Sequence, residues 1–346
     1  MWRAVWCAGL AAWVTAFAAP GLIPAPQVPA RLSAGAAARE EAVEKSPVSQ
    51  LWRDPGDVAA LDLRFGVGGR EHAPREAATY KFVKEDRNGT SAKFYVEDDQ
   101  GVEWLVKVGD EARPETAATR LVWAMGYLTD EDYYVDTLHV PGMPKLVRHS
   151  SHVSRDGTVH GARLERHIKG EKKTENWAWS ENPFFGTRAL NGLRVMMALV
   201  NNWDLKTVNN KVYREKDAEV RYVVADLGAS FGRTGAYTTR SKGKLKDYLK
   251  DPFIKRKDDQ TVDFVMRTKP GWLIKAFKGG YYRQRVAMGE IARGIPRSDA
   301  RWIGQQLAKL TDQQIGDAFR SAGFKPDEID GYTREVQRRI TELCAL

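Results

Sequence analysis

Two short stretches of the chain carry residues whose types and spacing could perform chemistry. The first, Asp204-Leu205-Lys206-Thr207-Val208-Asn209, places a carboxylate, an amine and an amide in order along one loop. The second, Asp226-Leu227-Gly228, begins seventeen residues after Asn209. Phosphoryl transfer uses such groups: a carboxylate that orients the acceptor hydroxyl, a cation near the phosphate, and an amide and second carboxylate that bind magnesium. The two stretches are therefore a candidate site for phosphoryl transfer.

A helix and a hairpin are predicted to position these two stretches. Apolar residues at 190, 193, 196, 197 and 200 repeat at helical spacing and predict a buried helix that ends just before Asp204. Residues 211–214 and 220–225 have strand-like patterns, and a turn at 216–218 joins them. This hairpin would bring Asp226 back beside Asn209.

The preceding part of the chain predicts a three-stranded antiparallel meander followed by a helix. Strands are expected at 80–83, 93–96 and 102–108, and Pro114 suits the first turn of a helix. That helix would carry Ala118, Leu121, Val122 and Met125 on one face. Glu115 projects from the same face, and a buried carboxylate needs a cation nearby. Lys107, at the end of the third strand, is the nearest candidate.

In this order the features resemble the protein-kinase-like superfamily, whose catalytic loop reads D-x-K-x-x-N and whose metal-binding turn reads D-x-G. The resemblance covers roughly residues 78–280 and is closest to the atypical HipA-like and phosphatidylinositol-kinase-like branches. It implies a two-lobed α+β fold with a small antiparallel-sheet N-lobe containing one helix and a mainly helical C-lobe. The expected parts are an N-lobe at 51–168, a catalytic part of the C-lobe at 169–283, and C-terminal helices at 284–346.

The same resemblance implies ATP and Mg²⁺ as cofactors and gives each site residue a role. Asp204 is the implied catalytic base and Lys206 the phosphate-side cation. Asn209 and Asp226 are the implied magnesium ligands. The implied nucleotide-binding residues are the lysine and glutamate pair and the loop between the first two strands: Lys107, Glu115, Asn88, Gly89, Thr90, Ser91 and Lys93.

Three features depart from the pattern of ordinary protein kinases. Asn202-Trp203 stands where those kinases have His-Arg, so regulation by phosphorylation of an activation loop is not expected. The phosphate-covering loop has one glycine rather than three, which predicts weaker donation from its backbone or donation by its side chains. Lys107 and Glu115 are only eight residues apart, which leaves Glu111 as a rival partner for the lysine.

Length, composition and charge limit the broader interpretation. The chain has 346 residues, of which 42% are hydrophobic and 29% charged, so it has enough apolar material for a sizeable core. A net charge of +9 favours acidic partners without choosing among them. Its two cysteines, Cys7 and Cys344, cannot form a disulfide framework.

The N-terminus predicts export. Residues 1–19 combine one positive charge, an apolar run and the small-x-small sequence Ala16-Phe17-Ala18, which is typical of a signal peptide. Pro20 ends a run that is short for a bilayer span, although an uncleaved anchor remains an alternative. Residues 20–50 are rich in Ala, Pro and Glu and are expected to form a flexible spacer.

A basic segment follows Asp226 and suggests an anionic partner, either an acidic protein or an anionic lipid. No motif supports nucleic-acid binding, and a monomer is expected. A solvated basic surface is the alternative interpretation. The basic residues are Arg240, Lys242, Lys244, Lys246, Lys250, Lys255, Arg256 and Lys257.

Together these features predict an exported ATP- and Mg²⁺-dependent kinase that phosphorylates a hydroxyl group of a protein or lipid headgroup. ATP is scarce outside the cytoplasm, which is in tension with export. The alternative is therefore a non-catalytic pseudokinase that binds a nucleotide or a partner after export.

Overall fold

The computed structural model describes residues 49–89, 91–148, 150–168, 170–171, 173–214, 219–234 and 240–346. The predicted signal at 1–19, nearly all of the predicted spacer at 20–50, Thr90 and the predicted turn at 216–218 lie outside the described residues. The described residues belong to one compact unit.

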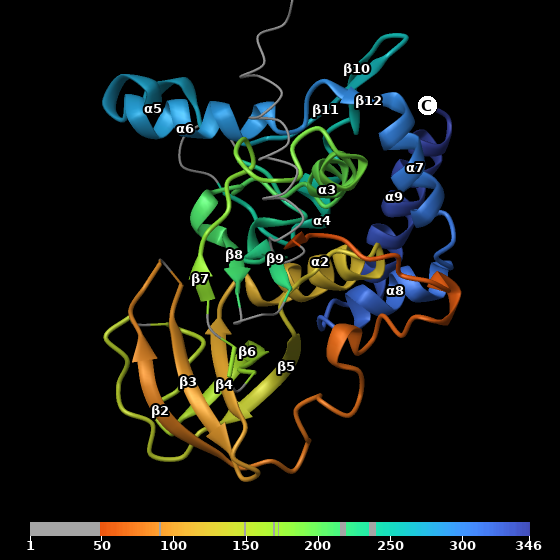
Figure 1. Ribbon diagram of the computed structural model, residues 1–346. Helices are drawn as coiled ribbons and strands as arrows, with labels where there is room; N and C mark the ends of the chain where they lie inside the picture. The colour runs from red at the N-terminus through yellow and green to blue at the C-terminus, as the bar shows by residue number, and fades with distance from the viewer. Residues whose placement is uncertain are drawn as a thin grey trace, which may run out of the picture. The chain divides into compact units, whose positions relative to one another are not determined.

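A five-stranded antiparallel sheet with the strand order β2-β3-β4-β6-β5 forms one part of this unit (Figure 1). The strands β2 (Tyr80–Asp86), β3 (Lys93–Asp98) and β4 (Glu103–Val108) form the predicted meander, which is confirmed. β6 (Thr158–Arg166) pairs with β4, and β5 (Asp132–His139) completes the sheet. In the register of the ladder, Lys107 lies between Lys93 and Arg163.

The helix α2 (Ala112–Ala124) crosses from this sheet to the helical part of the protein. Pro114 lies in its first turn, as the sequence predicts. Proline has no backbone N–H group, and the first turn of a helix does not need this donor. α2 contacts β5 and β6 of the sheet, and also α8 (Asp312–Arg320) and the short 3-10 helix η4 (Leu227–Ala229). It therefore positions Glu115 between the two parts.

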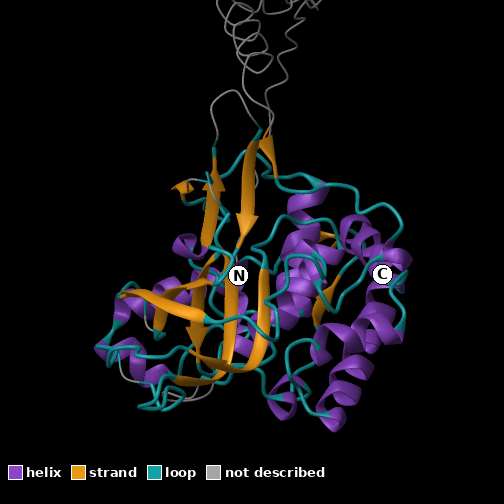
Figure 2. Cartoon of the chain, turned by 90° about the horizontal axis from the view of Figure 1, so that it is seen from below, coloured by secondary structure: helices purple, strands orange, loops and turns teal. Residues whose placement is uncertain are grey.

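Helices dominate the second half of the chain, and Figure 2 shows helices gathered around the C-terminus. They are α3 (Arg188–Leu199), α4 (Leu245–Tyr248), α5 (Trp272–Phe277), α6 (Gly279–Glu290), α7 (Arg297–Leu307), α8 and α9 (Pro326–Cys344). A four-stranded sheet has the order β1-β9-β8-β7, with β1 (Ser49–Gln50), β7 (Lys173–Glu175), β8 (Asn210–Tyr213) and β9 (Val220–Val224). A smaller sheet contains β10 (Ile254–Lys257), β11 (Thr261–Phe264) and β12 (Ile295–Pro296). The predicted α+β class is confirmed.

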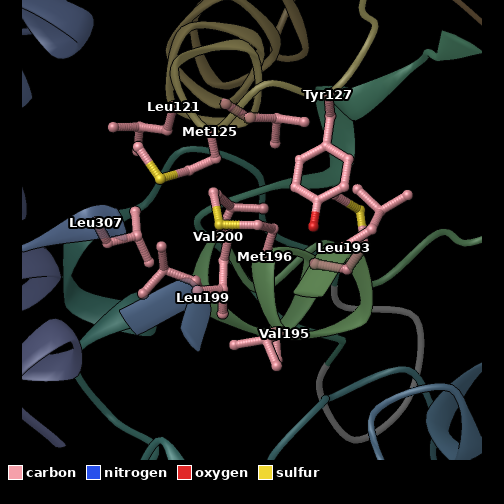
Figure 3. Packing of buried hydrophobic residues seen from close by; sticks show 14 of the residues in the cluster. Leu121, Met125, Tyr127, Leu193, Val195, Met196, Leu199, Val200 and Leu307 are labelled. Atoms are coloured by element: carbon pink, nitrogen blue, oxygen red, sulfur yellow. The ribbon is translucent and has the colours of Figure 1, made fainter. Parts of the chain in front are cut away.

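The apolar core of the helical part includes the predicted faces of α2 and α3. Leu121 and Met125 belong to the same buried cluster as Leu193, Met196 and Val200 (Figure 3). The periodic residues of α3 therefore lie in the core and fix the end of the helix from which the Asp204 loop departs. A capping box at Thr311 begins α8, and α9 begins at Pro326.

The segment that precedes the five-stranded sheet packs on the helical part. β1 pairs in parallel with β9, and Leu51, Val58 and Leu63 are buried in the helical core. The amide of Gln314 on α8 donates to the Val58 carbonyl at 2.9 Å, among other carbonyls of this segment. The start of the expected N-lobe at 51–168 is thus attached to the other part, because its apolar residues find their partners there.

No helix among the described residues is both long enough and apolar enough to cross a membrane.

A buried ion pair joins α2 to the sheet. Nη1 of Arg120 lies 3.3 Å from Oδ1 of Asp132, Nη2 donates to the Asp132 carbonyl at 2.6 Å, and both side chains are fully buried. Thr119 also donates to this carboxylate at 3.1 Å. Removal of one partner from a buried pair leaves the other charge uncompensated.

We expect Asp132→Ala to lower the free energy of unfolding by about 3 to 5 kcal/mol, because Arg120 would stay buried without its anion. Urea unfolding followed by far-UV circular dichroism measures the change. The matched control is Asp136→Ala, since Asp136 lies on the same strand but is exposed. Equal unfolding midpoints for the two variants would contradict the structural role given to Asp132.

Candidate active site

A cavity of about 820 Å³ is lined by residues of the five-stranded sheet, the segment that follows β6, and the β8–β9 hairpin. It contains apolar surface from Leu105, Ile168 and Val208 beside charged side chains. Seven of the predicted site residues line it: Asn88, Gly89, Lys93, Lys107, Glu115, Asn209 and Asp226. The fold therefore brings strand, helix and hairpin residues that are far apart in sequence to one cavity.

Lys107 is the centre of a buried charge cluster in this cavity. Its ammonium nitrogen lies 2.8 Å from a carboxylate oxygen of Glu115 and 2.6 Å from Oδ1 of Asp226. Glu111, the rival partner, also lies 2.8 Å from the same nitrogen. The structure therefore places both glutamates on the lysine, together with the aspartate of the D-L-G turn.

Burial and charge shift the pKa values in this cluster in opposite directions. Burial would lower the pKa of Lys107, but the carboxylates raise it above its ordinary value. Burial raises the pKa of Glu115 to about 7, against the opposing charges of Arg163 and Lys107. For Glu111, burial is outweighed by Lys107 and Lys242, which hold the pKa below its ordinary value. Lys107 likewise outweighs burial at Asp226 and lowers the pKa of that carboxyl group.

The turn after β9 gives Asp226 its place in the cluster. Asp226 adopts the left-handed backbone conformation with φ 51°, which an aspartate tolerates better than most residues do. Two residues later, Gly228 faces the start of α2. A Cβ atom at this position would lie 2.7 Å from the Glu111 Cβ atom, so only glycine allows η4 to approach α2 this closely.

Glu111 connects Lys107 to two further segments. Its carboxylate accepts a hydrogen bond from the Ser91 hydroxyl at 2.8 Å and lies 2.5 Å from the Lys242 ammonium nitrogen. Ser91 belongs to the predicted phosphate-covering loop, where Thr90 is outside the described residues. Lys93, from the same loop, lies 3.2 Å from Asp86.

The position of Lys242 corrects one of the predictions. The sequence predicts Lys242 in a basic surface segment, but its ammonium group contacts Glu111, because that buried carboxylate needs cations. The other seven basic residues of the segment are exposed. They lie on different elements: Lys246 is in α4, whereas Lys255, Arg256 and Lys257 are in β10.

The predicted catalytic loop lies beside the cavity. Asp204 and Lys206 form an ion pair at 2.6 Å and are not among the residues that line the cavity. The side-chain amide nitrogen of Asn209 donates to the Asp204 carbonyl at 2.7 Å, which ties the loop to the cavity wall. Arg285 of α6 also contacts Asp204, with Nη1 2.6 Å from Oδ1.

Asp226 and Asn209, which both line the cavity, fit a hard divalent cation. Asp226 offers a carboxylate whose side chain is 46% exposed, and its Oδ1 alone contacts Lys107. Because Asn209 uses its amide nitrogen on the Asp204 carbonyl, its amide oxygen is the end that remains for a cation. Oxygen ligands of this kind suit magnesium or calcium. Glu111 and Glu115 fit a cation less well, because the Lys107 ammonium already lies between them.

Two arginines of the site escape prediction from sequence. Arg163 lies opposite Lys107 in the β4–β6 ladder and 3.5 Å from Glu115, so it neutralises the same cluster. β6 also carries Glu165 and Arg166, so the sequence of the strand does not single out Arg163. Arg285 is separated from Asp204 by 81 residues, and no local pattern marks it.

Comparison with known proteins gives only distant similarities. No protein-family model and no curated protein matches the sequence. The proinflammatory kinase CtkA of Helicobacter pylori is similar over 77% of this chain and 97% of its own, with 9% identity and a TM-score of 0.44. The amicoumacin kinase hAmiN, in complex with AMP-PNP, Ca²⁺ and Ami, is similar over 78% of this chain and 90% of its own, with 10% identity and a TM-score of 0.21. The functional interpretation therefore rests on the geometry of the site.

We expect Lys107→Met to lower the free energy of unfolding by about 3 to 5 kcal/mol at pH 8, because buried carboxylates lose their cation. The loss should shrink as the pH falls toward about 4.5. In the wild type, the lowered pKa values of Glu111 and Asp226 stabilise the folded state at pH values above the ordinary pKa values of these groups. In the variant, burial without the lysine raises both pKa values, so the stability of the folded state falls as the pH rises. Urea unfolding at several pH values measures this difference.

Lys93→Met is the matched control for this experiment. Lys93 lies opposite Lys107 on the neighbouring strand, but its ion pair with Asp86 is partly exposed and should contribute under about 1 kcal/mol. A Lys107→Met variant whose loss of stability is independent of pH would show that the carboxylates do not depend on the lysine.

Proposed function

We propose that the protein is an ATP-dependent phosphotransferase that acts on a hydroxyl acceptor. One observation carries this proposal: Lys107 of β4 contacts both Glu115 of α2 and Asp226 of the D-L-G turn, at 2.8 and 2.6 Å. These contacts join three elements at a cavity that also contains Asn209. The arrangement has the parts that phosphoryl transfer needs, in which catalysis is mostly positioning and electrostatic stabilisation.

In this proposal the residues of the Lys107 cluster bind the nucleotide. Lys107 is held in the cavity with its charge intact, because burial is offset by carboxylates. Phosphate oxygens would take the place of one carboxylate as its partner, and Glu115 would keep the ammonium group in position. Asn88, Gly89 and Lys93 line the same cavity and would contact the phosphates. Asp226 and Asn209 would hold a magnesium ion, which when bound neutralises charge on the phosphate oxygens.

Asp204 would orient the acceptor. Its carboxylate would accept the hydrogen bond of the acceptor hydroxyl, and Lys206 would add positive charge beside it. The acceptor oxygen forms a bond to the γ-phosphorus, the bond from this phosphorus to the bridging oxygen breaks, and ADP keeps the electron pair. The hydroxyl proton passes to Asp204. This assignment is supported by the Asp204–Lys206 pair at 2.6 Å and by the link from Asn209 to the Asp204 carbonyl.

The acceptor and the place of action form a further part of the proposal. The seven exposed basic residues after Asp226 would favour an acidic protein or an anionic lipid headgroup. The predicted signal at residues 1–19 would direct the protein out of the cytoplasm, where it would need a compartment or a host that contains ATP.

A nucleotide- or partner-binding pseudokinase is the second candidate, and the contacts of Glu111 favour it. Glu111 contacts Lys107, Lys242 and Ser91 together, so it competes with a phosphate for the lysine. A protein in which Glu111 never releases Lys107 would bind nucleotide weakly and transfer no phosphate.

We expect Asp226→Asn to abolish the Mg²⁺-dependent part of the stabilisation by AMP-PNP, because the variant keeps the shape of the side chain but loses its ligand charge. Thermal unfolding with AMP-PNP, with and without Mg²⁺, measures the effect. Asp54→Asn is the control, since Asp54 lines the same cavity and its carboxylate accepts a hydrogen bond from the Gly56 backbone N–H at 2.9 Å. An undiminished Mg²⁺-dependent shift in Asp226→Asn would refute the assignment of Asp226 as a metal ligand.

Asp204→Asn should behave differently, because Asp204 contacts the acceptor rather than the nucleotide. We expect the variant to bind AMP-PNP as the wild type does and to lose turnover of ATP by about 10²-fold or more. Calorimetry of AMP-PNP binding and phosphate release from ATP separate the two properties. Parallel loss of binding and turnover would mean that Asp204 supports the fold instead.

A further inference from the structure

Arg285 lies in α6 and reaches the Asp204 loop from outside the cavity. Its side chain is 1% exposed. Nη1 lies 2.6 Å from Oδ1 of Asp204, and Nη2 donates to the Trp203 carbonyl at 2.5 Å. A guanidinium group is buried at this depth only when several partners satisfy it, so its contacts define its position closely.

The remaining contacts hold the Arg285 guanidinium rigidly. Nε donates to the Thr268 carbonyl at 2.8 Å, and the guanidinium carbon lies 5.0 Å from the centre of the Trp203 ring. The Thr268 hydroxyl in turn donates to the Arg285 carbonyl at 2.7 Å. The chain therefore fixes both the backbone and the side chain of this residue, independently of Asp204.

Arg285 and Lys206 each contact one oxygen of the Asp204 carboxylate. Arg285 contacts Oδ1, whereas Lys206 contacts Oδ2 at 2.6 Å. A carboxylate with a cation on each oxygen has a fixed orientation. In a loose phosphoryl-transfer transition state the attacking oxygen gains little charge, so correct placement of the carboxylate matters more than its strength as a base.

We infer that Arg285 is a positioning residue that sets the orientation of Asp204 for the acceptor hydroxyl. This inference rests on the proposed phosphotransferase function. Arg285 touches neither the nucleotide cavity nor, in the proposed reaction, the reacting atoms, and it acts through Asp204.

Another arginine, which is partly buried, shows what a structural role alone looks like. Arg194 of α3 donates to the carbonyls of Ile291 and Arg293, both at 2.6 Å, and to the side chain of Asn191. Arg285 has two carbonyl partners as well, but its third partner is the carboxylate of the candidate base. The two residues therefore form a matched pair for an experiment.

Arg285→Lys tests the inference, because lysine keeps the charge but cannot reach all the partners of a planar guanidinium group. With Mg·ATP as substrate and water as acceptor, we expect phosphate release to fall by about 10-fold to 10²-fold. The AMP-PNP dissociation constant, measured by calorimetry, should change by less than about 3-fold, because Arg285 does not contact the nucleotide site. Arg194→Lys should leave both quantities close to those of the wild type.

A double-mutant cycle with Asp204→Asn shows whether Arg285 acts through Asp204. In the Asp204→Asn protein, the further change Arg285→Lys should alter the residual phosphate release by less than about 2-fold. The same fractional loss in both backgrounds would overturn the inference, since Arg285 would then act elsewhere.

Two other outcomes for the single variant would also overturn it. Wild-type turnover in Arg285→Lys would show that Asp204 needs no positioning, and an equal loss of nucleotide binding and turnover would show a purely structural role. Failure of the proposed function is distinguishable from these results, because the wild-type protein itself would then release no phosphate from Mg·ATP, whether or not it binds AMP-PNP, and the inference would fall with it.

Discussion

A buried ammonium group keeps its charge only when anions surround it, and the candidate site is built around this requirement at Lys107. Its three carboxylate partners come from the residue before α2, from α2 itself and from the turn after β9. Arg163 and Lys242 add two cations to the same cluster, so three cations face three carboxylates. Loss of one partner would leave another charge buried without compensation. The charges are therefore all paired only when the sheet, α2 and the D-L-G turn are all in place.

Polar and charged contacts continue from the Lys107 cluster beyond the cavity in two directions. Arg163 lies 3.6 Å from Asp132, which in turn pairs with Arg120, so a line of buried charges follows the contact between the sheet and α2. On the other side, Asn209 ties the cavity to the Asp204 loop, and Arg285 anchors that loop to α6. The carboxylates that matter for the proposed chemistry are thus oriented before any ligand binds, which lowers the cost of reaching a productive geometry.

The sequence predicts the elements of this fold better than it predicts the contacts of its charges. Period-two and helical patterns give the meander, α2, α3 and the β8–β9 hairpin, since each pattern lies within one element. They also place Lys107, Glu115 and Asp226 at element ends that face one cavity. The patterns miss Arg285 and misplace Lys242, because the carboxylates that bind these residues are 81 and 131 residues away. Strand β1 has only two residues, so its sequence pattern is too short to predict that residues 49–63 pack on the helical part.

The most direct measurement of the central claim is a crystal structure of the protein with AMP-PNP and Mn²⁺, with the ion located by its anomalous scattering. The account predicts an anomalous peak beside the carboxylate of Asp226 and the amide oxygen of Asn209, with a phosphate oxygen on Lys107 and Glu115 still in contact with the ammonium group. A peak between Glu111 and Glu115 with Lys107 displaced, or a nucleotide bound away from this cavity, would contradict it.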